Sequence, residues 1–342
     1  MVEDKVPESA WRRSAWRRST RRLWRTAHEK EDLGTPLGVW VTDDCVVLAR
    51  FDRLDGYGVA TGTRLWTWRP PGQDVVGVVS ADVEDGVGVV LHYDDGTREA
   101  AHVCLTALDP ASGTVVWSRK EERDRLGHVG RHNGQVALGT GRLATVTGNW
   151  STAPRLRVDD ARTGRTRWHG TLDDERSEVG AVVGAMPLVA RLEARGARGR
   201  PRLRVDETTV ELPPAYAEFG RHVAVTGDVL VAELVPRDEQ EREKHVTLGA
   251  FSVTTGKPLW DWRVRCGSSG VFPLAHGGWL LALHHYGERL SVLDPADGRL
   301  VGEHRLGGGW AFSPLLAAHG DVIAVACTSS GQARRLRVFR RR

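Results

Sequence analysis

The chain has 342 residues, of which 40% are hydrophobic and 27% charged, and its formal net charge is +4. A chain of this length buries roughly three quarters of its unfolded surface, so its core needs neither disulfides nor a metal. The four cysteines show no CxxC or other zinc-ligand spacing, which argues against a disulfide framework and a zinc site. They are Cys45, Cys104, Cys266 and Cys327. The apolar runs fall short of the roughly 18 residues of a membrane helix, so no transmembrane segment is predicted.

The N-terminal segment carries a tandem pattern, in which Trp11, Arg12 and Arg13 recur as Trp16, Arg17 and Arg18. Arginine interleaved with tryptophan suits an anionic membrane surface or nucleic acid, and such binding is predicted only for this segment. The simpler interpretation is a flexible, solvated arm over residues 1–19. The twin arginines that follow Thr20 resemble an export signal, but no apolar stretch comes after them. We therefore expect a cytoplasmic protein whose residues 20–342 form one domain.

A turn pattern repeats along the remaining chain: an apolar strand, an Asp, a Gly four residues later, and a Trp four residues beyond that. Its copies hold Gly62 and Trp66; Asp109, Gly113 and Trp117; Asp160, Gly164 and Trp168; Gly256 and Trp260; and Asp294 and Gly298 without the Trp. The glycines are separated by 51, 51, 92 and 42 residues, and a degenerate copy near Asp206 lies in the longest gap. A repeat unit is therefore 42 to 51 residues long.

Each position of the pattern has a physical role in a β-hairpin. The Asp accepts hydrogen bonds from backbone N–H groups of the turn, and the Gly supplies the positive φ that closes it. The Trp falls on the returning strand, where burial of its ring is expected to hold one repeat against the next. Further strand pairs flank Asp85-Gly86, Gly227-Asp228, Gly277-Gly278 and Gly320-Asp321. Four strands in each unit of this length predict the blades of a β-propeller.

Counting units predicts an all-β, seven-bladed propeller of four-stranded antiparallel blades. The expected blades span about 37–68, 73–118, 127–171, 178–213, 218–264, 268–306 and 309–340. The last unit ends without a returning strand, and an exposed edge of that kind invites aggregation. Residues 20–26, around Trp24, resemble an orphan returning strand. We expect this N-terminal strand to complete the last blade and close a monomeric ring.

The pattern Leu-Asp-x-x-Ser/Thr-Gly-x-x-x-Trp resembles the repeat of the pyrroloquinoline-quinone-like (PQQ-like) propeller family. That family includes quinoprotein dehydrogenases and an outer-membrane assembly lipoprotein that binds no cofactor. The resemblance implies a propeller over residues 37–340. Dehydrogenases of the family are longer, mostly eight-bladed and exported, and many carry adjacent cysteines beside the quinone; this chain has no adjacent cysteines. The closer resemblance is therefore to the non-catalytic propeller.

No residue pattern names a reaction. The stretch Gly139-Thr140-Gly141 matches a dinucleotide loop in spelling, but a strand-like run follows where that loop opens a helix. His284 and His285 are adjacent in a strand and point to opposite faces, so they do not share a metal ion. We predict no catalytic, cofactor or metal residues, and a function as a protein-interaction or scaffolding module. The alternative is a small-molecule sensor, or an oxidoreductase that uses PQQ with calcium in the propeller funnel.

Overall fold

The computed structural model of the chain describes residues 21–26, 36–72, 74–93, 102–122, 136–139, 141–147, 155–171, 177–183, 188–193, 202–205, 208–265, 270–284, 289–306, 311–329 and 334–341. Their regular secondary structure is almost entirely β-strand. They form seven four-stranded antiparallel sheets, six of which contain four strands that are consecutive in the chain. The predicted all-β class and the antiparallel blades are confirmed.

The first three sheets follow one another along the chain. The first contains β2 (Gly38–Val41), β3 (Cys45–Ala49), β4 (Leu54–Gly58) and β5 (Arg64–Trp68). The second contains β6 (Val75–Val79), β7 (Gly88–Tyr93), β8 (His102–Leu108) and β9 (Val115–Glu122). The third contains β10 (Val136–Gly139), β11 (Arg142–Thr147), β12 (Arg155–Asp160) and β13 (Thr166–Thr171).

The next three sheets repeat this order. The fourth contains β14 (Ser177–Val183), β15 (Leu188–Glu193), β16 (Arg202–Val205) and β17 (Thr208–Glu211). The fifth contains β18 (Tyr216–Thr226), β19 (Val229–Pro236), β20 (His245–Ser252) and β21 (Pro258–Arg265). The sixth contains β22 (Val271–His276), β23 (Trp279–His284), β24 (Arg289–Leu293) and β25 (Leu300–Arg305).

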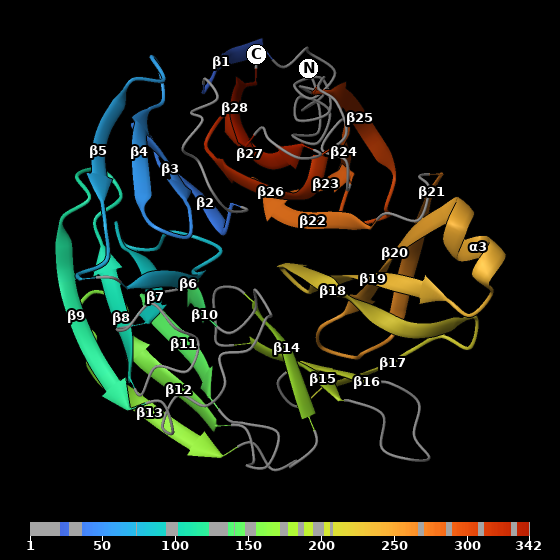
Figure 1. The fold of residues 1–342 in the computed structure, drawn as a ribbon. Coiled ribbons are helices and arrows are strands. Elements are labelled where there is room, and N and C mark those ends of the chain that lie inside the picture. Colours follow the sequence, from blue (N-terminus) through green and yellow to red (C-terminus); the bar gives the residue numbers. More distant parts are fainter. Residues whose placement is uncertain are drawn as a thin grey trace, which may run out of the picture.

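The last sheet joins the two ends of the chain. It contains β26 (Ala311–His319), β27 (Val322–Ser329) and β28 (Arg334–Arg340), and its fourth strand is β1 (Arg21–Arg25). β1 pairs antiparallel with β28, with Arg21 opposite Arg340 and Arg25 opposite Arg337. The predicted N-terminal closing strand is therefore confirmed. Figure 1 shows the sheets arranged around a common centre, with the first strand of each sheet innermost and the fourth outermost.

The core lies between neighbouring sheets. One cluster joins the last sheet to the first, and it includes Val46 and Leu48 from β3 and Ala324 from β27. The next joins the first and second sheets through Trp40, Cys45 and Val90. A sheet that is covered on both faces in this way has a largely apolar second strand, as in the fully buried β3.

The turns form as the repeat predicts. Gly62, Gly113, Gly164, Gly256 and Gly298 have φ between +67° and +71°, a region that favours glycine. The Asp109 carboxylate accepts a hydrogen bond from the Ala111 backbone N–H at 2.8 Å. The charged run at residues 237–245 contains the short helix α3 (Glu239–Lys244), whose first turn is capped by the Asp238 side chain. Within the described residues, no helix is long and apolar enough to cross a membrane.

Candidate functional site

A cavity of about 350 Å³ lies among the innermost strands and the turns that follow them. β2 contributes Trp40, the loop between β6 and β7 contributes Asp82 and Glu84, and the ends of β22 and β26 contribute His276 and His319. The walls are fixed locally: the Trp40 indole donates a hydrogen bond to the Ser80 carbonyl at 2.7 Å. This volume is at the low end of the range of small-molecule sites.

The lining of this cavity is acidic. Burial raises the pKa of Asp82, and the nearby Glu84 carboxylate raises it further, whereas His276 acts in the opposite direction. The Gly141 N–H donates to Glu84 at 3.4 Å. His319 lies 3.2 Å from a carboxylate oxygen of Asp43 at the edge of the same region. Such a set can accept a cation or hydrogen-bond donors, but the described lining residues include no Ser, Thr, Cys or Lys that would serve as a nucleophile.

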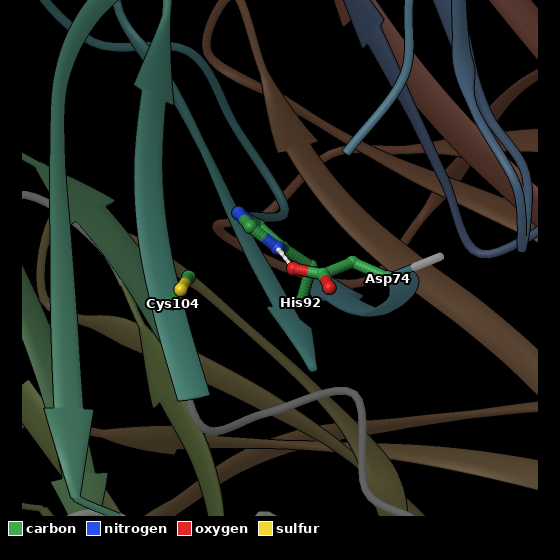
Figure 2. A group of neighbouring side chains, drawn as sticks. All are labelled: Asp74, His92 and Cys104. Carbon is green, nitrogen blue, oxygen red and sulfur yellow. Dashed lines mark hydrogen bonds and ion pairs between the residues drawn. The ribbon is translucent and has the colours of Figure 1, made fainter. Parts of the chain in front are cut away.

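A second polar group is buried between the first and second sheets. A ring nitrogen of His92 on β7 lies 2.8 Å from Asp74, and the other lies 2.9 Å from the Thr106 hydroxyl on β8. The Thr106 hydroxyl continues to the Ser118 hydroxyl on β9 at 2.9 Å. Figure 2 shows Asp74 hydrogen-bonded to His92, with Cys104 on the neighbouring strand.

The order Asp–His–Thr resembles the hydrogen-bonded chain of a hydrolase. Thr106 is only 2% exposed, however, and the described cavity at the propeller centre is lined by other residues. A substrate carbonyl cannot approach a hydroxyl buried in this way. The group therefore does not provide a hydrolytic site.

The repeat tryptophans link one sheet to the next. Four of them donate the indole N–H to a backbone carbonyl in the following turn: Trp24 to Val59 at 2.6 Å, Trp66 to Pro110 at 3.2 Å, Trp117 to Ala161 at 2.8 Å and Trp260 to Pro295 at 2.9 Å. Each ring covers the turn glycine, so that a Cβ on Gly164 would lie 2.8 Å from the Trp117 ring. The glycine thus serves both the turn conformation and the contact between sheets.

Trp168 departs from the predicted role. It exposes 50% of its surface and packs over Gly170 of its own strand. The reason lies in the next sheet, where only two residues separate β16 from β17 and no turn glycine is present. Trp168 therefore has no equivalent turn to cover. In the fourth sheet Thr209 replaces the Trp, and its backbone carbonyl lies against Gly256 instead.

Comparison with known proteins identifies the family. The family model described as outer membrane protein assembly factor BamB matches residues 14–233 and 244–339. The chain belongs to this family. A comparison with curated proteins gives no match. Among solved structures, quinohemoprotein alcohol dehydrogenase ADHIIG from Pseudomonas putida HK5 is similar at 11% sequence identity and a TM-score of 0.49, and the match covers 89% of this chain and 66% of that one.

The PQQ-like resemblance calls for a test of the cavity against that cofactor. Pyrroloquinoline quinone carries carboxylate groups, which Asp82 and Glu84 would repel. Among the described residues that line the cavity there is no Arg or Lys to pair with those groups. Without a cation to bridge them, the described lining residues do not fit the carboxylates of this cofactor.

The remaining sequence predictions fall into two groups. The arm residues 11–18, and the division of the chain at residue 19, lie outside the described residues and stay predictions. Gly141 lies in the tight turn between β10 and β11, which is a hairpin and not the start of a helix.

Sequence reasoning missed Asp74 and His92 altogether. An available signal was that His92 and His284 lie at or next to the end of the second strand of their unit, with a Trp-x-Trp pair in the outer strand before it.

Proposed function

We propose that this propeller is a non-catalytic protein-interaction or scaffolding module that binds its partner through the outer surface of the third sheet. The observation that carries the proposal is Trp168, the repeat tryptophan that has no turn to cover and is half exposed on β13. Tryptophan is enriched among the residues that dominate binding energy at protein interfaces. A rigid ring that presents such a side chain provides a pre-organised docking surface.

Neighbouring outer strands extend this surface. Val115 and Val116 on β9 are 45% and 43% exposed, and Leu65 on β5 is 55% exposed. Figure 1 shows β5, β9 and β13 side by side along one part of the outer rim. Each is also the last strand of its sheet, with one edge available for pairing. The description of the family as an assembly factor supports an interaction role. The chain's own partner is proposed to be a protein.

The proposed compartment is the cytoplasm. Among the described residues, Cys45 and Cys104 form no disulfide, which fits a reducing environment. Binding to an anionic membrane surface or nucleic acid through residues 11–18 is a separate proposal, and it predicts binding that weakens steeply with salt.

Affinity purification from native lysate tests the interaction. The full chain, a chain lacking residues 1–19, and the variants Trp168→Ala and Leu259→Ala are compared. Leu259 is a matched control because it is 48% exposed on an outer strand at another part of the ring. We expect a stoichiometric protein that Trp168→Ala binds about 30-fold more weakly, corresponding to about 2 kcal/mol. Equal recovery by both variants would refute the proposed surface, and loss with the truncated chain would assign recognition to the arm.

A second candidate function is the sensing of a small cationic ligand, which the acidic cavity favours. Thermal denaturation with candidate cations tests it, because a ligand present at 100 times its Kd stabilises the folded state by about 2.7 kcal/mol. The variant Asp82→Asn should abolish the shift. A shift that this variant retains would place the ligand elsewhere.

A further inference from the structure

We propose that Asp74, His92 and Cys104 form a zinc-binding site between the first and second sheets. The carboxylate, imidazole and thiol atoms of these residues all lie within 4.8 Å of one another. They come from three separate positions in the chain. Asp74 directly precedes β6, His92 is the second-last residue of β7, and Cys104 lies opposite His92 on β8. A set of one oxygen, one nitrogen and one sulfur ligand is typical of Zn²⁺.

The Asp74–His92 separation can be compared with that of a tetrahedral site, and the Cys104 sulfur lies no more than 4.8 Å from the other two ligand atoms. Zn–N and Zn–O bonds of about 2.0 Å place the two ligand atoms about 3.3 Å apart. Asp74 and His92 are 2.8 Å apart, so a widening of about half an ångström admits the ion. The three residues leave a fourth position for water, and the partial exposure of Cys104 provides an entry path.

The second contact of His92 is one that a metal ligand needs. The Thr106 hydroxyl at 2.9 Å can accept the Nε2–H proton, which leaves the Nδ1 lone pair directed at Asp74. In the other tautomer, Nδ1–H donates to Asp74 and the Thr106 hydroxyl donates to Nε2. The position between Nδ1 and the carboxylate is thus taken either by that proton or by a metal ion, and the nearby thiol favours the metal.

Charge balance supports this occupant. The side chains of His92 and Asp74 are only 2% and 6% exposed, and an ionised carboxylate at such depth is costly unless it is paired. A carboxylate and a thiolate together neutralise Zn²⁺. The Trp68 ring, whose centroid is 5.7 Å from that of His92, closes one side and lowers the local dielectric.

The sixth sheet contains an equivalent histidine with the same tryptophan and hydroxyl neighbours, but it lacks the thiol. His284 ends β23, hydrogen-bonds to the Ser291 hydroxyl at 3.1 Å and meets the Trp262 ring edge-on at 6.2 Å between centroids. Extending the register of β23 and β24 by one pair places Arg289 opposite His284, where the second sheet has Cys104. A cation at that position excludes a metal. The second sheet thus differs from its repeat equivalent in the residue that would complete the site.

Titration with Co²⁺, followed by displacement with Zn²⁺, tests the proposal on the full chain refolded without metal. We expect one equivalent of Co²⁺ per chain, with the visible bands of a tetrahedral site and a thiolate charge-transfer band. Cys104→Ser should lose the thiolate band, and Asp74→Asn should lose stoichiometric binding. Thr106→Val, which removes the hydroxyl bonded to His92, should weaken affinity by 10- to 100-fold.

Two variants serve as controls. Cys45→Ala removes the fully buried thiol of the first sheet, and His284→Gln alters the equivalent histidine; both should bind the metal as the natural chain does. Zinc should also raise the Tm of the natural chain, a readout that does not depend on any variant folding. Failure to take up Co²⁺ or Zn²⁺ stoichiometrically, or a thiolate band that survives Cys104→Ser, would overturn the site.

Discussion

The contact between a repeat tryptophan and the next turn can be measured with two glycine substitutions. Gly164 and Gly72 have nearly the same positive φ, +67° and +68°. A Cβ on Gly164 would lie 2.8 Å from the Trp117 ring, whereas a Cβ on Gly72 would meet no atom within 4 Å. Alanine at either position bears the cost of a left-handed conformation, which is about 1–2 kcal/mol. Only Gly164→Ala also displaces a tryptophan.

The additional cost follows from what the displaced ring loses. A shift of the Trp117 side chain away from its preferred rotamer costs about 0.5–1.5 kcal/mol, and loss of its hydrogen bond to the Ala161 carbonyl costs about 1 kcal/mol. We therefore expect Gly164→Ala to lower the free energy of unfolding by about 2 kcal/mol more than Gly72→Ala. Equilibrium denaturation in urea, with the m-value checked for each protein, measures the difference. Equal effects of the two substitutions would refute the interpretation of Trp117 as a link between sheets.

Further predictions concern ring closure, buried titratable groups and a buried ion pair. Deleting residues 1–28 removes β1 and should lower the Tm sharply, because β28 loses its partner strand and the cluster beside it is exposed. Burial, aided by the charge of Arg289, lowers the pKa of His284 to about 4. The neutral imidazole therefore contributes up to about 3 kcal/mol to the free energy of unfolding above pH 6.5, and this contribution is lost as the pH falls toward 4. Burial raises the pKa of Glu233 to about 7, so its contribution has the opposite sign: it is present below pH 4.5 and is lost as the pH rises through 7. Asp55→Asn should cost about 3–5 kcal/mol, because the fully buried Asp55 carboxylate pairs with Arg50 and Arg53.

Each of these predictions has its own control. Deleting residues 1–19 spares β1 and should leave the Tm unchanged; a similar loss in both deletions would argue against ring closure. Stability measured against pH for His284→Gln and Glu233→Gln separates the two opposing slopes, and a variant that keeps the natural slope contradicts the assignment. Asp261→Asn removes a carboxylate that is 57% exposed and should change stability by less than about 0.5 kcal/mol. A comparable cost at Asp55 would mean that its ion pair is not needed.

The fold could be predicted from the sequence because the turn pattern repeats. Turn glycines such as Gly113 and Gly298 recur at the spacing expected of a series of equivalent hairpins. Each adopts the positive φ that its own turn requires, so the signal is local in the sequence. The orphan strand around Trp24 was recognisable for the same reason, since it carries the tryptophan with which outer strands such as β5 and β9 cover the next turn. α3 was missed because a six-residue helix depends on one cap, Asp238, and carries no buried face that would show as periodicity.

What the sequence by itself determined is the β-propeller of repeated hairpins, because each turn and alternating strand is encoded within a few neighbouring residues. Only the tertiary structure decided which residues meet between sheets. Trp168 is exposed because the following sheet lacks a turn glycine, and the turn concerned is about 40 residues further along the chain. Asp74, His92 and Cys104 converge because strand register sets His92 opposite Cys104 and a loop brings Asp74 alongside. The spacing of the cysteines gave no indication of the proposed zinc site, because ligands contributed by paired strands have no fixed spacing in the sequence.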